Sequence, residues 1–150
     1  TYPAVYRGIL NFFGDIWTFI RDVVIVNRNA NYNSVYLLKK GVNHADITID
    51  NIQDKCYFIG DQANSNNFIT EFDFRFGPYF IPNKVGTNKK ADYNWIRGNN
   101  GQDTDKAVRV LLLGGSAING SGAGSGDFNS GWVRSDSDAA VGFFTTVKLD

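Results

Sequence analysis

The sequence predicts an α+β fold, with one or two helices near the N-terminus followed by short antiparallel strands and long loops. Three observations support this fold class. Apolar residues between positions 6 and 20 recur at spacings of three and four, as on an amphipathic helix. Short β-branched or alternating runs follow. Polar stretches rich in Asn, Asp and Gly separate these runs, as turns and loops do.

The predicted N-terminal helix covers residues 6–20. Gly14 interrupts its pattern, so an alternative start lies there, with residues 6–13 as a loop or strand. We interpret the large apolar side chains as core, because nothing reactive accompanies them. The predicted apolar face consists of Ile9, Phe12, Phe13, Ile16, Trp17 and Ile20.

Short strands are predicted through the middle of the chain, at residues 23–26, 34–38, 45–52, 55–60 and 68–76. In the last of these, Phe72, Phe74 and Phe76 would point to one side of the strand. Residues 27–33 are predicted to be a turn. Residues 81–105 are predicted to be an ordered loop, with Tyr93 and Trp95 as isolated anchors.

The C-terminal region, residues 107–149, contains an apolar run at 108–113, a long segment rich in Gly and Ser, and an alternating run at 141–149. We expect strands at both ends of the long segment. A loop of this length inside a compact domain is uncommon unless it binds something or is disordered, and flanking strands would hold it in place. The sequence therefore predicts a binding surface here.

Composition narrows the function classes. We expect one domain over residues 1–150, since 43% of the residues are hydrophobic. Fifteen Lys and Arg balance fifteen Asp and Glu, so no nucleic-acid partner is expected. The absence of an apolar run of ~20 residues predicts no membrane insertion by this domain. The chain starts at Thr1 and lacks Met, so we expect a processed protein or a fragment.

Candidate chemistry is sparse. Gly115 and Gly120 have P-loop spacing, but Ser121 and Gly122 stand where Lys and Ser or Thr are needed, so nucleotide binding is not expected. The lone His44 is interpreted as a loop histidine. Recurring Asp and Asn residues lack EF-hand spacing and are interpreted as turn residues. We expect no cofactor, no metal and no enzymatic activity.

The lone Cys56, in an apolar context, is interpreted as a buried residue. It excludes an internal disulfide framework and any zinc site with several thiolates.

Motifs at both ends of the chain resemble those of one known family. The N-terminal motifs are Tyr6-Arg7-Gly8-Ile9 and Phe13-Gly14-Asp15-Ile16-Trp17. The C-terminal motifs are Leu112-Leu113-Gly114-Gly115-Ser116, Asn119-Gly120, Ala123-Gly124 and Val141-Gly142-Phe143. Together they resemble the variable proteins of diversity-generating retroelements. The resemblance implies a C-type lectin fold of the formylglycine-generating-enzyme type.

The resemblance also implies a function. It is that of a non-enzymatic binding protein, displayed on a virion tail or cell surface, that recognises a host or partner cell-surface protein or glycan. Adenine-directed mutagenesis would diversify its C-terminal loop surface. The implied ligand-binding residues are Ala117, Ile118, Ser121, Gly122, Ser125, Asp127, Asn129, Gly131 and Trp132.

This sequence departs from the family pattern in two ways. An aromatic residue is usual where Ala117 stands and often near Gly126 and Asp127, whereas this chain carries small residues there. Trp132 cannot arise by the family's codon route, so it is interpreted as scaffold or as a fixed contact.

Two alternatives remain open at this point. One is a relative of the formylglycine-generating oxidases, although Cys56 alone cannot supply their copper-binding cysteine pair. The other is a structural tail or envelope module. Calcium-dependent sugar binding is disfavoured, because the EPN and QPD triplets of true C-type lectins are missing.

Overall fold

The computed structural model describes residues 5–6, 9–10, 17–76, 79–89, 91–98, 103–115, 126–135 and 141–145. The predicted α+β, C-type lectin-like fold is wrong, because these residues are mostly strand. Helical structure in the described ranges is limited to η1 (His44–Asp46) and the four-residue α1 (Ile52–Lys55). The predicted helix at 6–20 is also wrong where it is described, since β1 (Val5–Tyr6), β2 (Ile9–Leu10) and the start of β3 (Trp17–Asn27) lie there. Phe12, Phe13 and Ile16 of its predicted apolar face lie outside the described residues.

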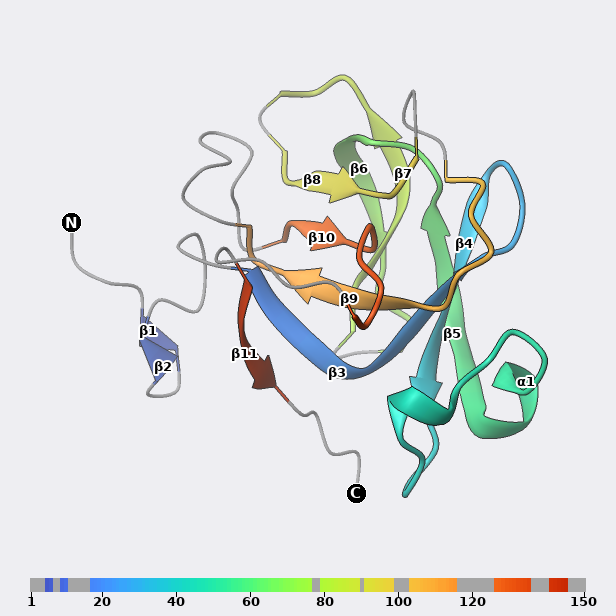
Figure 1. Ribbon diagram of the computed structural model, residues 1–150. Helices are drawn as coiled ribbons and strands as arrows, with labels where there is room; N and C mark the ends of the chain where they lie inside the picture. Colours follow the sequence, from blue (N-terminus) through green and yellow to red (C-terminus); the bar gives the residue numbers. More distant parts are fainter. Residues whose placement is uncertain are drawn as a thin grey trace.

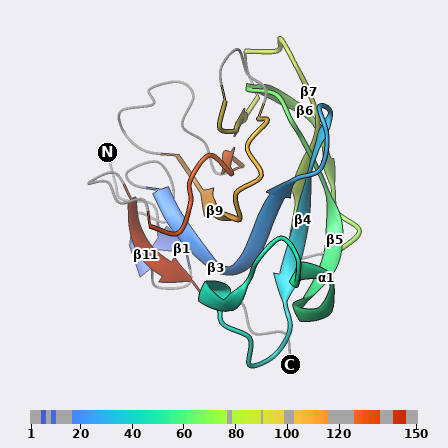
Figure 2. The same ribbon diagram turned by 45° about the vertical axis from the view of Figure 1, so that its right-hand side comes forward.

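Nine strands form one mixed sheet in the order β5-β4-β3-β9-β10-β8-β6-β7, with β11 paired to β3. The pairs β10–β8 and β11–β3 are parallel and the other pairs of the sheet are antiparallel. The sheet curls, so that β5 and β7 at the two ends of this order pack against each other (Figures 1 and 2). The remaining strands are β4 (Tyr32–Leu38), β5 (Cys56–Ala63), β6 (Asn67–Asp73), β7 (Ile81–Gly86), β8 (Tyr93–Trp95), β9 (Arg109–Leu113), β10 (Phe128–Asn129) and β11 (Val141–Thr145).

Strand β3 has three neighbours in the sheet, and its second half, residues 23–27, is buried on both faces. It pairs with β4, β9 and β11, and its register with β9 shifts between Ile20 and Val24, where the ribbon bends (Figure 1). Val23 and Ile25 face the interior of the curl, whereas Val24 and Val26 belong to a second cluster on the opposite face. The run at 23–26, which is buried on both faces, was predicted as a strand, whereas residues 17–20 of β3 fell within the predicted helix.

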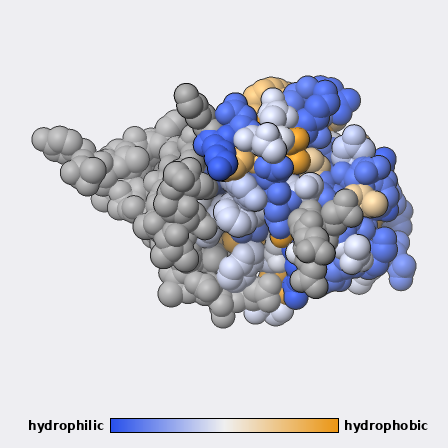
Figure 3. Space-filling model, turned by 90° about the horizontal axis from the view of Figure 1, so that it is seen from above, coloured by the Kyte–Doolittle hydropathy of each residue, from blue (hydrophilic) through white to orange (hydrophobic). Residues whose placement is uncertain are grey.

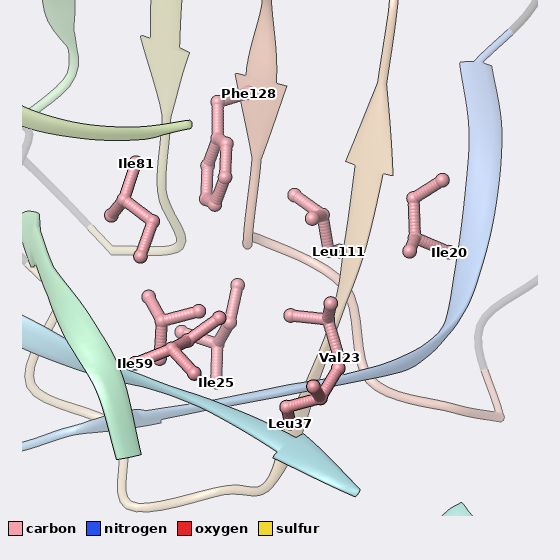
Figure 4. Close-up of a cluster of buried hydrophobic side chains, with 9 residues drawn as sticks. Ile20, Val23, Ile25, Leu37, Ile59, Ile81, Leu111 and Phe128 are labelled. Carbon is pink, nitrogen blue, oxygen red and sulfur yellow. The ribbon is translucent and has the colours of Figure 1, made fainter. Parts of the chain in front are cut away.

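The main core fills the interior of the curled sheet (Figure 4). Ile25 and Ile59 meet Ile81 and Phe128 there, so strands far apart in the sheet order share one cluster. The two ends of the sheet meet at Gly60, where an added Cβ would lie 2.8 Å from the Ile81 Cδ1. Glycine at this position allows β5 and β7 to approach each other.

Residues 39–55 cover the outer face of β3 and β4, and the second cluster lies between this segment and the two strands. Ile47 and Ile52 pack there with Val24 and Tyr36, while Ile49 is 46% exposed. The predicted strand at 45–52 is therefore wrong. Polar side chains instead satisfy the local backbone, because Asn43 caps η1 and Asn51 and Thr48 accept hydrogen bonds from each other's backbone N–H groups.

Several predicted strands are confirmed: 23–26 lies within β3, 34–38 within β4, most of 55–60 within β5 and most of 108–113 within β9. The predicted loop at 81–105 is wrong where β7 and β8 form. The predicted strand at 68–76 ends early, because β6 stops at Asp73 and Phe74 and Phe76 are exposed in the turn. Among the described helices, none is long and apolar enough to cross a bilayer.

Candidate functional site

The segment predicted to vary leaves the sheet at β9 and returns to it at the neighbouring β10. Phe128 pairs with Leu113, and the Gly114 N–H donates to the carbonyl of Asp127 at 3.2 Å. Gly114 and Gly115 have φ of 95° and 68°, a conformation that side chains with a Cβ rarely adopt. The two glycines therefore turn the chain out of β9 at this point.

Five of the predicted contact residues lie outside the described residues: Ala117, Ile118, Ser121, Gly122 and Ser125. The other four are Asp127, Asn129, Gly131 and Trp132, which lie where the chain rejoins the sheet at β10 or just beyond it. Gly131 and Trp132 are half-buried, and the Trp132 carbonyl accepts a hydrogen bond from the Val110 N–H at 3.0 Å. Their role in ligand contact stays a prediction.

The side chains of Asp127 and Asn129 are buried and accept hydrogen bonds from backbone N–H groups instead of facing solvent. Asp127 is 0% exposed, and its Oδ1 accepts a hydrogen bond from the Tyr93 N–H at 2.7 Å, which ties β10 to β8. Asn129 is 7% exposed, and its Oδ1 accepts from the Gly131 N–H at 2.8 Å. These side chains therefore fix the path of the chain, and a ligand contact by either would need the chain to open.

A buried ion pair supports the start of β9. Arg109 and Asp103 are each 1% exposed, and the guanidinium donates two hydrogen bonds to the carboxylate, one of them from Nη2 to Oδ1 at 2.7 Å. Burial strengthens such a pair only when its other hydrogen-bonding groups are also satisfied. Asn27 and Asn64 hold the Asp103 backbone by donating to its carbonyl at 2.6 and 2.7 Å, whereas the buried Nε of Arg109 has no hydrogen-bond partner among the described residues.

Buried amides extend this network to the other side of the curl. Asn33 donates to Gln62, Gln62 donates to Asn94 at 2.8 Å, and Asn94 donates to the carbonyls of Ala63 and Ser65 at 2.9 Å each. This network could not be predicted from the sequence, because Asn27 and Asn33 belong to a stretch with turn composition. The available signal was their position directly beside two apolar strand runs.

A hollow of about 370 Å³ lies at the seam between the two ends of the sheet, and we call it the seam hollow. The turn between β3 and β4 and the end of β5 form one side, and β6 and β7 form the other. Figure 3 looks down on this end of the molecule, where hydrophilic residues cover much of the described surface. The described lining residues are Ala30, Asn31, Tyr32, Ala63, Asn64, Ser65, Thr70, Asn83, Lys84 and Val85.

His44 and Cys56 are both buried. Burial lowers the pKa of His44, although hydrogen bonding to the Arg109 backbone partly opposes this. Burial raises the pKa of the Cys56 thiol to about 11, with Lys39 opposing, so the thiol stays protonated near neutral pH. No group of three or more His, Cys, Asp or Glu side chains that could hold a metal ion is found within the described ranges.

Comparisons of the chain with protein-family models, with curated proteins and with solved structures gave no match. Two features of the chain's own geometry are candidates for function: the frame formed by β9, β10 and residues 103–109, and the seam hollow.

Proposed function

We propose that the chain is a non-enzymatic binding domain that presents residues 116–125 to a host or partner cell-surface protein or glycan, from a virion tail or a cell surface. The observation that carries this proposal is the pairing of β9 with β10, which fixes both ends of the segment at one place on the sheet. Binding residues are commonly found on loops that a rigid scaffold positions.

The frame around this segment has the features that a variable surface requires. Leu112 and Phe128 are almost fully buried, and the Arg109–Asp103 pair fixes the start of β9. Sequence changes between the two strands would then leave the core intact, whereas changes in the strands would not. This supports diversification of the segment by the retroelement mechanism that the sequence motifs suggest.

Burial limits the proposed variable positions. Asp127 and Asn129 form the hydrogen bonds that tie β10 and the following turn, so substitution there removes bonds to backbone groups. We therefore propose that diversity is concentrated at Ala117, Ile118, Ser121, Gly122 and Ser125.

Sequencing the coding locus across a population tests the proposal. We expect substitutions at adenine-containing codons to gather at residues 117–125, next to an invariant template repeat and a reverse transcriptase gene. A uniform distribution of substitutions along the chain would contradict diversification.

A stability comparison tests the role of the frame. We expect Ser121→Ala and Ser125→Ala to change the free energy of unfolding by less than about 0.5 kcal/mol, and Asp127→Ala to cost ~1–3 kcal/mol. Urea unfolding of the three variants measures this. Equal losses in all three would remove the distinction between the segment and its frame.

A further inference from the structure

The seam hollow borders the network around Asp103, through Asn64, and no sequence motif suggested it. The two ends of the sheet touch where Gly60 faces Ile81. Farther along the seam, toward the turn between β3 and β4, the lining residues leave a hollow of about 370 Å³. Small-molecule sites have volumes of ~300–1,000 Å³, so one small polar ligand or one residue of a longer chain would fit.

Asn64 gives the hollow a fixed wall. Its Nδ2 donates to the carbonyls of Asn29 and Asp103, at 3.1 and 2.7 Å, and its Oδ1 accepts from the Asp103 N–H at 2.9 Å. The Asn64 N–H also donates to the carbonyl of Asn31 at 2.9 Å. The network that contains Arg109 therefore holds this wall in place before any ligand arrives, which lowers the entropic cost of binding.

Other lining side chains keep unused hydrogen-bonding groups. Within the described part of the chain, the side chains of Asn31, Ser65 and Thr70 and the Tyr32 hydroxyl form no hydrogen bond. The Tyr32 side chain is 38% exposed, so part of its ring is open to contact. Tyrosine surrounded by Asn and Ser is a composition typical of binding surfaces, because the ring gives rigid contact area and the small polar groups adapt.

The charge at the hollow is neutralised. Lys84 is the one charged residue among the described lining, and its Nζ lies 2.7 Å from the Glu71 Oε2. The other Glu71 oxygen accepts a hydrogen bond from Asn83 at 2.9 Å. An anionic ligand would meet the Glu71 carboxylate as well as the lysine, so the charges favour a neutral ligand with many hydroxyl groups.

We propose that the seam hollow binds a neutral saccharide. A pyranose ring has an apolar C–H face that can lie against Tyr32, and its hydroxyl groups both donate and accept, which matches the amide and hydroxyl groups of Asn31, Ser65 and Thr70. The hollow opens to solvent, so the bound sugar can be part of a longer glycan.

Chemical-shift titration of the 15N-labelled protein with glucose, galactose, mannose and N-acetylglucosamine tests the proposal, with inorganic phosphate as the anionic probe. We expect weak, saturable binding of at least one sugar and no binding of phosphate. Tyr32→Ala should weaken the affinity about tenfold or more, and Thr70→Val, which removes one hydroxyl at constant shape, about three- to tenfold.

Two matched variants control for general effects. Tyr57 is 59% exposed and Thr104 is exposed, and neither lines the hollow, so Tyr57→Ala and Thr104→Val should leave the affinity unchanged. Circular dichroism of each variant checks that it folds. The proposal is overturned if none of the four sugars binds, if phosphate alone binds, or if folded Tyr32→Ala and Thr70→Val bind sugar as tightly as the two controls.

Discussion

Arg109 is a charged side chain that is almost completely buried. Its contribution to stability depends on its ion pair with Asp103. Arg109→Leu would leave the Asp103 carboxylate buried without its cation, so we expect a loss of ~3–5 kcal/mol in the free energy of unfolding. Urea denaturation measures the loss. Arg28→Leu is the matched control, because the side chains of Arg28 and its partner Asp61 are 52% and 30% exposed and the loss should be at most ~1 kcal/mol. Similar losses in the two variants would show that burial adds nothing to the Arg109 pair.

His44 should make the stability of the fold depend on pH. Burial lowers its pKa in the folded state below the ordinary value of 6.5, so between these two values the unfolded chain binds more protons than the folded chain. We expect the free energy of unfolding to fall as the pH is lowered below 6.5 and to be insensitive to His44 above it. Urea unfolding between pH 5 and 8 measures this. A His44→Gln variant with the same slope as the parent protein below pH 6.5 would contradict the assignment.

The burial of Cys56 could be predicted from the sequence, but the burial of Asn27 and Asn33 could not. An apolar neighbourhood identifies a buried thiol, because the thiol needs no particular partner. An amide is buried only where distant groups meet it. Asn27 lies against the Asp103 carbonyl, and no local pattern contains that contact.

Strand β9 could be predicted from its own sequence, whereas strand β10 could not. The run Val110, Leu111 and Leu112 indicates a buried strand directly, and β9 forms there. Strand β10 has two residues, and its parallel pairing with β8 and antiparallel pairing with β9 come from the curl of the whole sheet. The predicted N-terminal helix was wrong where β3 starts, because Trp17 and Ile20 are buried in a strand whose partners, β9 and β11, lie far away in the sequence.

The burial of Phe128 on β10 gives a prediction about stability. Phe128 is 1% exposed and projects from β10 into the core, so Phe128→Ala should cost ~3–5 kcal/mol by leaving a cavity. Phe74→Ala is the matched control, because Phe74 is 67% exposed and should change stability by less than about 0.5 kcal/mol. Thermal or urea unfolding measures both. A small loss for Phe128→Ala would show that β10 is not anchored in the core.

For the whole molecule, closure of the curled sheet depends on the contact between Gly60 and Ile81. Gly60→Ala would place a Cβ against the Ile81 Cδ1, so we expect a loss of ~1–3 kcal/mol. Ile81→Val removes that methyl group and should cost ~0.5–1.5 kcal/mol alone. In the double variant, we expect a loss smaller than the sum, measured by urea unfolding as a double-mutant cycle. Strict additivity would show that the two ends of the sheet do not meet at this point.

The parallel pairing of β3 with β11 has a consequence for biosynthesis. Trp17 pairs with Val141, so a central strand is completed by residues that are synthesised much later. At ~5–20 residues per second, the ribosome delivers the second partner on the order of 10 s after the first. During that interval one edge of β3 is open, and nascent chains with such an edge are prone to pair wrongly with one another. A holding chaperone should therefore raise the yield of this protein more than it raises the yield of proteins whose strands pair with near neighbours.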